Sequence, residues 1–134
     1  MAKAVGVGGV FFKSSHPRRL AKWYSRHLGI TLEWKAAASF KPRDMPEAGF
    51  TVWSIFPRAT RYFGPSTKPF IINLVVDDLD EALQQVRRGG GEIVGDVEEY
   101  PYGRFGWFLD PDRNKVELWQ PPVRRGRRRK SKKE

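Results

Sequence analysis

The sequence predicts an α+β fold made of two similar modules that together enclose a cleft. Three observations lead to this prediction. Each half of the 134-residue chain runs through a strand-like segment, an amphipathic helix and further strand-like segments. Both helices carry clear start and stop signals. The strand-like segments are apolar on both faces, so both faces should be covered, one by helices and one by something else. Two such modules would enclose a cleft lined by the faces that the helices leave free.

The first module spans about residues 5–57 and opens with the strand-like segment VGGVFFKSS. The helix begins at Pro17, whose missing N–H is harmless at the first helical position, and Gly29 can end it in the left-handed conformation. One apolar stripe follows helical spacing: Leu20, Trp23, Tyr24 and Leu28. The segments ITLEW and FTVWSIF supply the remaining strands, and Trp34 belongs to the outer one.

The second module spans about residues 69–121 and opens with the strand-like segment FIINLVV. Asp78 can cap the following helix while Glu81, three residues on, reaches back to it. The apolar stripe consists of Leu79, Ala82, Leu83 and Val86. Three glycines from Gly89 end the helix, and EIV, RFGWFLD and KVELW are the remaining strands.

The turn DPDRN sets how the last two strands face each other. A three-residue loop with Arg113 in the left-handed conformation pairs Leu109 with Lys115, Trp107 with Glu117 and Phe105 with Trp119. Arginine in that conformation costs about 1–2 kcal/mol, so a four-residue loop is a competing geometry. It would place Glu117 opposite Phe108.

On the favoured register, Glu117 is a carboxylate among aromatic side chains. A carboxylate in an apolar cleft is costly unless it is paired, protonated, bound to a metal ion or used in function. We therefore expect Glu117 to lie in the cleft. The competing interpretation is a glutamate on a solvated sheet edge, shielded by Lys115.

Three motifs in this chain resemble the vicinal oxygen chelate superfamily, the group of glyoxalases, bleomycin resistance proteins and extradiol dioxygenases. They are HPRRLAKWYSRHLGI, the stretch from Val76 to Gly91, and YGRFGWFLDPDRNKVELWQP. The resemblance covers about residues 5–121, although His16 stands where the family often has an aspartate. It implies paired βαβββ modules that form an incomplete eight-stranded, barrel-like cup with the helices outside.

The resemblance also implies where a metal ion would bind, on the first and last strands of each module. Only Glu117 matches a ligand position; Ile71 and Gly9 cannot ligate, and Asn73 lies two residues from the usual position. One carboxylate does not hold a divalent ion with useful affinity. His16 and His27 fall at the ends of the first helix, away from the cup. We therefore expect no cofactor, and a divalent metal ion is the less favoured alternative.

These features predict a glyoxalase-like protein that binds a small, mostly apolar or aromatic molecule without metal. Stacking surface would come from four aromatic side chains, and hydrogen bonds from Asn73 and Glu117. The four aromatics are Trp53, Phe105, Trp107 and Trp119. The alternative is a metal-dependent or Glu117-dependent lyase or isomerase that acts on a small carbonyl compound. The sequence favours binding over catalysis. Members of the family that it resembles often form homodimers, and the sequence permits the same here.

Charge and composition bound the remaining possibilities. The chain has no cysteine and no apolar run of the ~20 residues that a membrane span needs, so we expect a cytoplasmic protein without membrane contact. Residues 124–134 hold eight Lys or Arg and one Glu, and so carry +7 of the net +10 charge. We expect this tail to be disordered and the glyoxalase-like domain to end near residue 123. The tail is either a solubilising segment or a nonspecific nucleic-acid contact.

Overall fold

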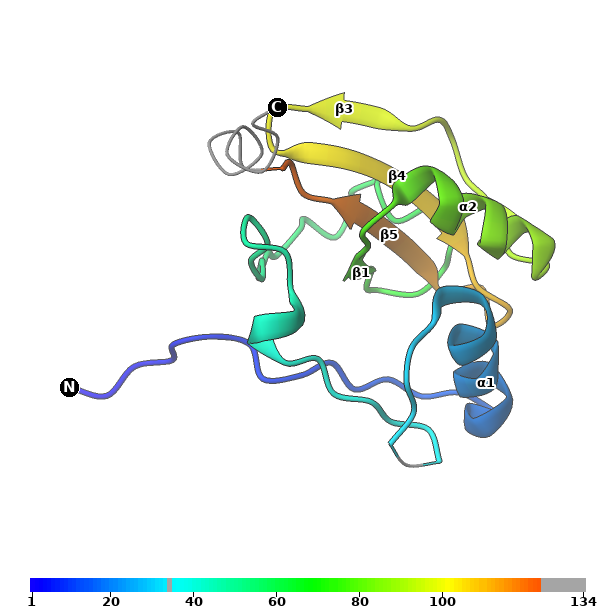
Figure 1. Ribbon diagram of the computed structural model, residues 1–134, viewed down its shortest axis with the longest axis horizontal. Coiled ribbons are helices and arrows are strands. Elements are labelled where there is room, and N and C mark those ends of the chain that lie inside the picture. The colour runs from blue at the N-terminus through cyan, green and yellow to red at the C-terminus, as the bar shows by residue number, and fades with distance from the viewer. Residues whose placement is uncertain (34, 124–134) are drawn as a thin grey trace, which may run out of the picture.

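A computed structural model describes residues 1–33 and 35–123. Within them the chain forms an α+β structure in which two α-helices pack on one face of an open, mixed five-stranded sheet (Figure 1). The predicted strand position of Trp34 and the predicted disordered tail, residues 124–134, lie outside this part of the chain. Neither α-helix is both long and apolar enough to cross a membrane, among the residues described.

The two helices begin and end where the sequence signals predict. Helix α1 spans Pro17–Leu28 and ends at Gly29, which has a φ of 66°. Helix α2 spans Leu79–Arg88, and the Asp78 side chain accepts a hydrogen bond from the backbone N–H of Glu81 at 3.0 Å. Asp78 therefore caps α2 and Gly29 ends α1 in the left-handed conformation, as predicted.

All five described strands belong to the second half of the chain. They are β1 (Ile72–Val75), β2 (Glu92–Ile93), β3 (Glu98–Tyr100), β4 (Gly103–Leu109) and β5 (Lys115–Gln120). The order is β1-β5-β4-β2, with β3 also pairing to β4; β1 runs parallel to β5 and the other pairs are antiparallel. Strand β3 was not predicted, because its three residues are all exposed and show no apolar pattern.

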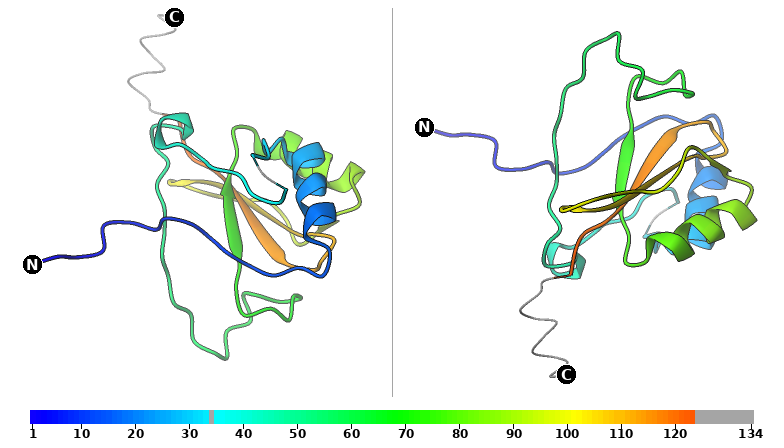
Figure 2. Two further views of the ribbon diagram at one scale, coloured as in Figure 1. Left: turned by 90° about the horizontal axis from the view of Figure 1, so that it is seen from below. Right: turned by 90° about the horizontal axis from the view of Figure 1, so that it is seen from above.

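The core lies between the helices and one face of the sheet, and both additional views place α1 and α2 on that same side (Figure 2). Leu79 and Val86 of α2 pack there with Phe108 and Val116, and all four side chains are fully buried. The indole N–H of Trp23 donates to the carbonyl of Gly89 at 2.8 Å, which fixes α1 against the end of α2. These contacts cover one face of the sheet and leave the opposite face for the site described below.

The first module differs from the prediction. Segments 5–12 and 50–56 are drawn out but contain no strand, and a short 3-10 helix, η1 (Pro42–Asp44), lies between them. Their large apolar side chains are mostly exposed; Phe11 is 96% and Trp53 76% accessible. A strand needs a neighbour for its backbone N–H and C=O groups, and these segments pair with no strand in the described chain. The alternating apolar pattern therefore indicates a preference for extended structure, but it does not show whether a neighbouring strand is present to pair with.

Candidate ligand-binding face

The turn between β4 and β5 is closed by a buried carboxylate. Asp110 is 3% exposed. It accepts hydrogen bonds from the Tyr24 hydroxyl at 2.7 Å, from the Asn114 side-chain amide at 2.9 Å, and from the backbone N–H groups of Asp112 and Asn114 at 2.9 Å each. Arg113 has a φ of 66°. The three-residue loop is therefore confirmed, and the four-residue alternative is wrong.

This turn fixes the register that brings the candidate residues together. The pairs Leu109–Lys115, Trp107–Glu117 and Phe105–Trp119 face each other as predicted. Side chains alternate between the two faces of a strand, so Phe108 and Val116 point to the helices while Trp107 and Glu117 point away from them. Asn73 of β1 is the parallel-strand neighbour of Glu117 and reaches the same face.

Aromatic rings form a continuous row on this face. Phe105 lies near parallel to Trp119, with ring centroids 6.1 Å apart and planes at 7°, and near parallel to Trp107 at 6.5 Å and 18°. Phe50 meets Trp119 edge-on at 4.9 Å. The indole N–H of Trp119 donates to the carbonyl of Tyr102 at 2.8 Å. This bond holds the ring where only Gly103, with a φ of 134°, leaves it room.

Tyr62 is the principal site residue that the sequence prediction missed. Its hydroxyl accepts a hydrogen bond from the Trp107 indole N–H at 2.9 Å and donates one to Glu117 Oε1 at 3.2 Å. The Lys115 ammonium group lies 4.8 Å from the centre of its ring and also donates to its backbone carbonyl. Tyr62 lies in the loop PRATRYFGPSTKP. An aromatic residue within a polar loop is the sequence feature that could have pointed to a site residue here.

The half-buried position of Glu117 changes its acidity. Burial raises the pKa of the Glu117 carboxyl group above its ordinary value of 4.5. The hydrogen bond from Tyr62, the charge of Lys115 and polar contacts with Asn73 and Trp107 oppose part of that rise. Burial and the neighbouring Glu117 raise the pKa of Tyr62, which keeps its hydroxyl protonated. Burial lowers the pKa of Lys115.

The structure brings together five of the six predicted site residues. Glu117, Asn73, Phe105, Trp107 and Trp119 share the face, although Asn73 is exposed. Trp53 does not join them; it lies in the strandless segment 50–56 and is largely in solvent. That segment nevertheless crosses the aromatic row, since Phe50 contacts Trp119 and Phe56 stacks on Tyr62, with centroids 5.7 Å apart and planes at 2°.

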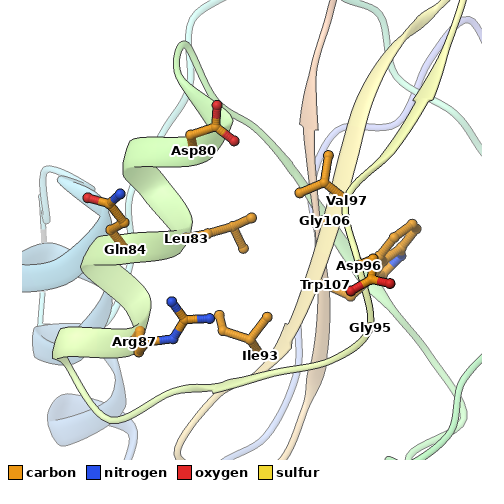
Figure 3. Close-up of a pocket in the computed structure, with 10 residues that line it drawn as sticks. All are labelled: Asp80, Leu83, Gln84, Arg87, Ile93, Gly95, Asp96, Val97, Gly106 and Trp107. Carbon is orange, nitrogen blue, oxygen red and sulfur yellow. The ribbon is translucent and has the colours of Figure 1, made fainter.

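Two hollows in the described structure lie elsewhere. One, of about 340 Å³, opens between α2 and the β2–β4 side of the sheet (Figure 3). There Leu83 points from α2 toward the sheet, and the Trp107 ring lies on the side of β4 away from α2. The other, of about 520 Å³, is lined by Lys13, Lys68 and Arg113 among others. Trp107 lines the first hollow, and Glu117 lines neither.

The donor set at this face does not suit a divalent metal ion. Glu117 provides one carboxylate; its neighbours are an amide, a phenol that already donates to it, and an indole N–H that cannot ligate. Hard cations need several oxygen ligands and transition metals favour imidazole or thiolate. His16 and His27 lie at opposite ends of α1, behind the sheet. Within residues 1–33 and 35–123, no three His, Cys, Asp or Glu side chains gather in a way that could hold an ion.

Comparison with known proteins places this chain in a family. A family model described as a glyoxalase-like domain matches residues 9–119. No curated protein matches the chain. Several solved structures do, but the chain spans only about 40% of the length of the first of them.

Three of these structures illustrate the range of similarity. A member of the glyoxalase/bleomycin resistance protein/dioxygenase superfamily from Sphaerobacter thermophilus is 34% identical over 37% of this chain and 40% of its own, with a TM-score of 0.34. TnmS3, an antibiotic binding protein from a Streptomyces species, is 33% identical over 38% and 41%, with a TM-score of 0.34. A glyoxalase-related enzyme from Fulvimarina pelagi is 16% identical over 91% of both chains, with a TM-score of 0.48. With the family match covering most of its length, the chain belongs to the glyoxalase-like domain family.

Proposed function

We propose that this protein binds a small, largely flat and apolar molecule on the aromatic face around Glu117, without a metal ion. The observation that carries the proposal is the placement of one half-buried carboxylate beside a row of three parallel rings. Flat rings offer stacking area at little entropic cost, and a lone polar group fixes the orientation of what stacks there. TnmS3, which is 33% identical over 38% of this chain, is an antibiotic binding protein.

Charge narrows the class of ligand. Glu117 lies next to Lys115, so the face offers an acceptor without a strong negative field. The chain as a whole carries +10. A strongly cationic ligand would be repelled by the protein and gain little from Glu117. A neutral or weakly basic aromatic compound fits better.

The aromatic face supplies one wall of the predicted cup, and the first module would supply the opposite wall. Segment 50–56 already crosses the aromatic row, and its apolar residues Val52, Trp53 and Ile55 are exposed on the outside. Soluble monomers rarely expose apolar patches of this kind. In this proposal a second copy of the chain covers them, so that the ligand-binding cup is completed in a homodimer.

A second candidate is proton abstraction next to a carbonyl group, as a lyase or isomerase performs. One observation favours it: burial raises the pKa of Glu117, which makes the carboxylate a stronger base. The Trp107 indole N–H, once free of Tyr62, could donate to the developing oxyanion. Stoichiometric Zn²⁺, Ni²⁺ or Mn²⁺ retained after desalting would support the metal-dependent form of this candidate and contradict the metal-free proposal.

A thermal-shift screen of neutral and weakly basic aromatic compounds tests the binding proposal. A ligand that binds only the folded state raises its melting temperature. Glu117→Gln should weaken the binding of each such ligand about tenfold. The substitution turns a charge-assisted hydrogen bond into a neutral one, and a loss of ~1.4 kcal/mol corresponds to that factor. Glu81→Gln is the matched control, because Glu81 is exposed on α2, on the opposite side of the sheet from this face. Equal weakening by both variants, or no effect of either, would contradict a role for Glu117 in recognition.

A further inference from the structure

Tyr62 occupies a part of the aromatic face where hydrogen-bonding groups converge. Its hydroxyl lies between the Trp107 indole N–H, at 2.9 Å, and Glu117 Oε1, at 3.2 Å. Phe56 stacks parallel to its ring on one side, and the Lys115 ammonium group lies 4.8 Å from the ring centre. The surroundings of Tyr62 thus satisfy both the polar atom and the ring of a phenol.

Trp107, Glu117, Phe56 and Lys115 surround Tyr62 and form a socket, whose polar groups suit a hydroxyl group. Trp107 can only donate, and an ionised Glu117 can only accept. A hydroxyl group satisfies both at once, because it donates one hydrogen and accepts with its lone pairs. An ammonium group would leave the indole N–H without an acceptor, and a ketone would leave the carboxylate without a donor. A phenol also supplies the ring for Phe56 and Lys115.

We infer that the ligand of this face is a phenolic aromatic compound, whose hydroxyl replaces that of Tyr62 between Trp107 and Glu117. The inference deepens the proposed function and rests on it. Tyr62 is then an internal competitor that holds the socket until a ligand with more stacking area displaces it. Its loop position permits this: Tyr62 is 37% exposed, and the chain around it contains no helix or strand in the described structure.

Self-occupancy has a measurable consequence. A ligand that binds only when Tyr62 has left has an apparent affinity reduced by the fraction of molecules in that state. Removing the Tyr62 side chain eliminates the competitor and leaves the socket groups in place. The variant Tyr62→Ala should therefore bind a small phenol more tightly than the wild-type protein does.

The probe is p-cresol, which reproduces the tyrosine side chain, and the control ligand is 4-methylanisole, its methyl ether, which cannot donate to Glu117. Isothermal titration should show p-cresol binding to Tyr62→Ala at least about tenfold more tightly than to wild type, the factor equivalent to 1.4 kcal/mol. 4-Methylanisole should bind Tyr62→Ala about tenfold more weakly than p-cresol. The double variant Tyr62→Ala/Glu117→Gln should lose that preference.

One further variant and the wild-type screen separate the possible failures. Tyr62→Phe keeps the ring and removes only the hydroxyl, so it should bind p-cresol with an affinity between those of wild type and Tyr62→Ala, and it serves if the alanine variant does not fold. Equal affinity for p-cresol and 4-methylanisole, or equal p-cresol affinity in wild type and both variants, overturns the phenolic class while leaving aromatic binding intact. Absence of binding by any aromatic compound in the wild-type screen overturns the proposed function itself.

Discussion

The hydrogen bond from Tyr24 to Asp110 offers a sharp test of how the fold positions the site. Tyr24→Phe removes only the hydroxyl and keeps the buried ring against Trp23. Hydrogen bonds to charged groups contribute about 1.5–3 kcal/mol. Asp110 retains three other donors after the substitution, so we expect a loss near 1.5–2 kcal/mol, in the lower part of that range.

This loss converts into an observable change in melting temperature. A domain of this size has an unfolding entropy of about 0.25 kcal/mol per kelvin, so Tyr24→Phe should lower the melting temperature by about 6–8 °C. Differential scanning calorimetry and urea denaturation would measure it. Unfolding slopes that match wild type would show that the native state is otherwise preserved.

Tyr100→Phe is the matched control. The Tyr100 hydroxyl donates to Glu98 at 2.6 Å, but the pair is exposed on β3, and surface substitutions of this kind usually change stability by less than about 0.5 kcal/mol. If Tyr24→Phe costs no more than Tyr100→Phe, then the buried carboxylate does not hold the turn, and the account of how Glu117 comes to face Trp107 fails.

Three further predictions follow from the charges and exposed surfaces. Burial raises the folded-state pKa of Glu117, so the contribution of this carboxyl group to stability is lost as the pH rises through that pKa. The melting temperature of Glu117→Gln should therefore rise relative to that of wild type above pH 4.5. A constant difference between the two melting temperatures from pH 4 to 8 would contradict this. Trp53→Glu should convert a homodimer to a monomer in size-exclusion chromatography with light scattering, whereas Lys3→Glu, also in an exposed segment, should not. Deleting residues 124–134 should abolish salt-sensitive binding to duplex DNA, and unchanged binding would remove the tail from consideration.

The two helices and the turn between β4 and β5 could be predicted because local chemistry determines them. Asp78, Gly29 and Arg113 act within a few residues of their own position, and each adopts the expected conformation. The predicted register then brought Trp107 and Glu117 together, since it follows from the length of one turn.

Two features depended on contacts that no local pattern encodes. Tyr62 reaches Glu117 across 55 positions of sequence, from a loop with no periodicity. Segment 50–56 has the alternation of a strand, but a strand forms only where a neighbour pairs with its backbone, and the described chain provides none. For the same reason Trp53, which was predicted to line the site, is exposed.

The titration of Glu117 itself tests the central claim most directly. In protein labelled with ¹³C at the glutamate carboxyl carbon, the Glu117 resonance can be assigned by its absence from the Glu117→Gln spectrum and followed with pH. The midpoint should lie above 4.5, as expected for a carboxyl group partly withdrawn from water among aromatic rings. A midpoint at or below 4.5 would show that burial does not dominate at this carboxyl group and would contradict the assignment of this face as an apolar binding site.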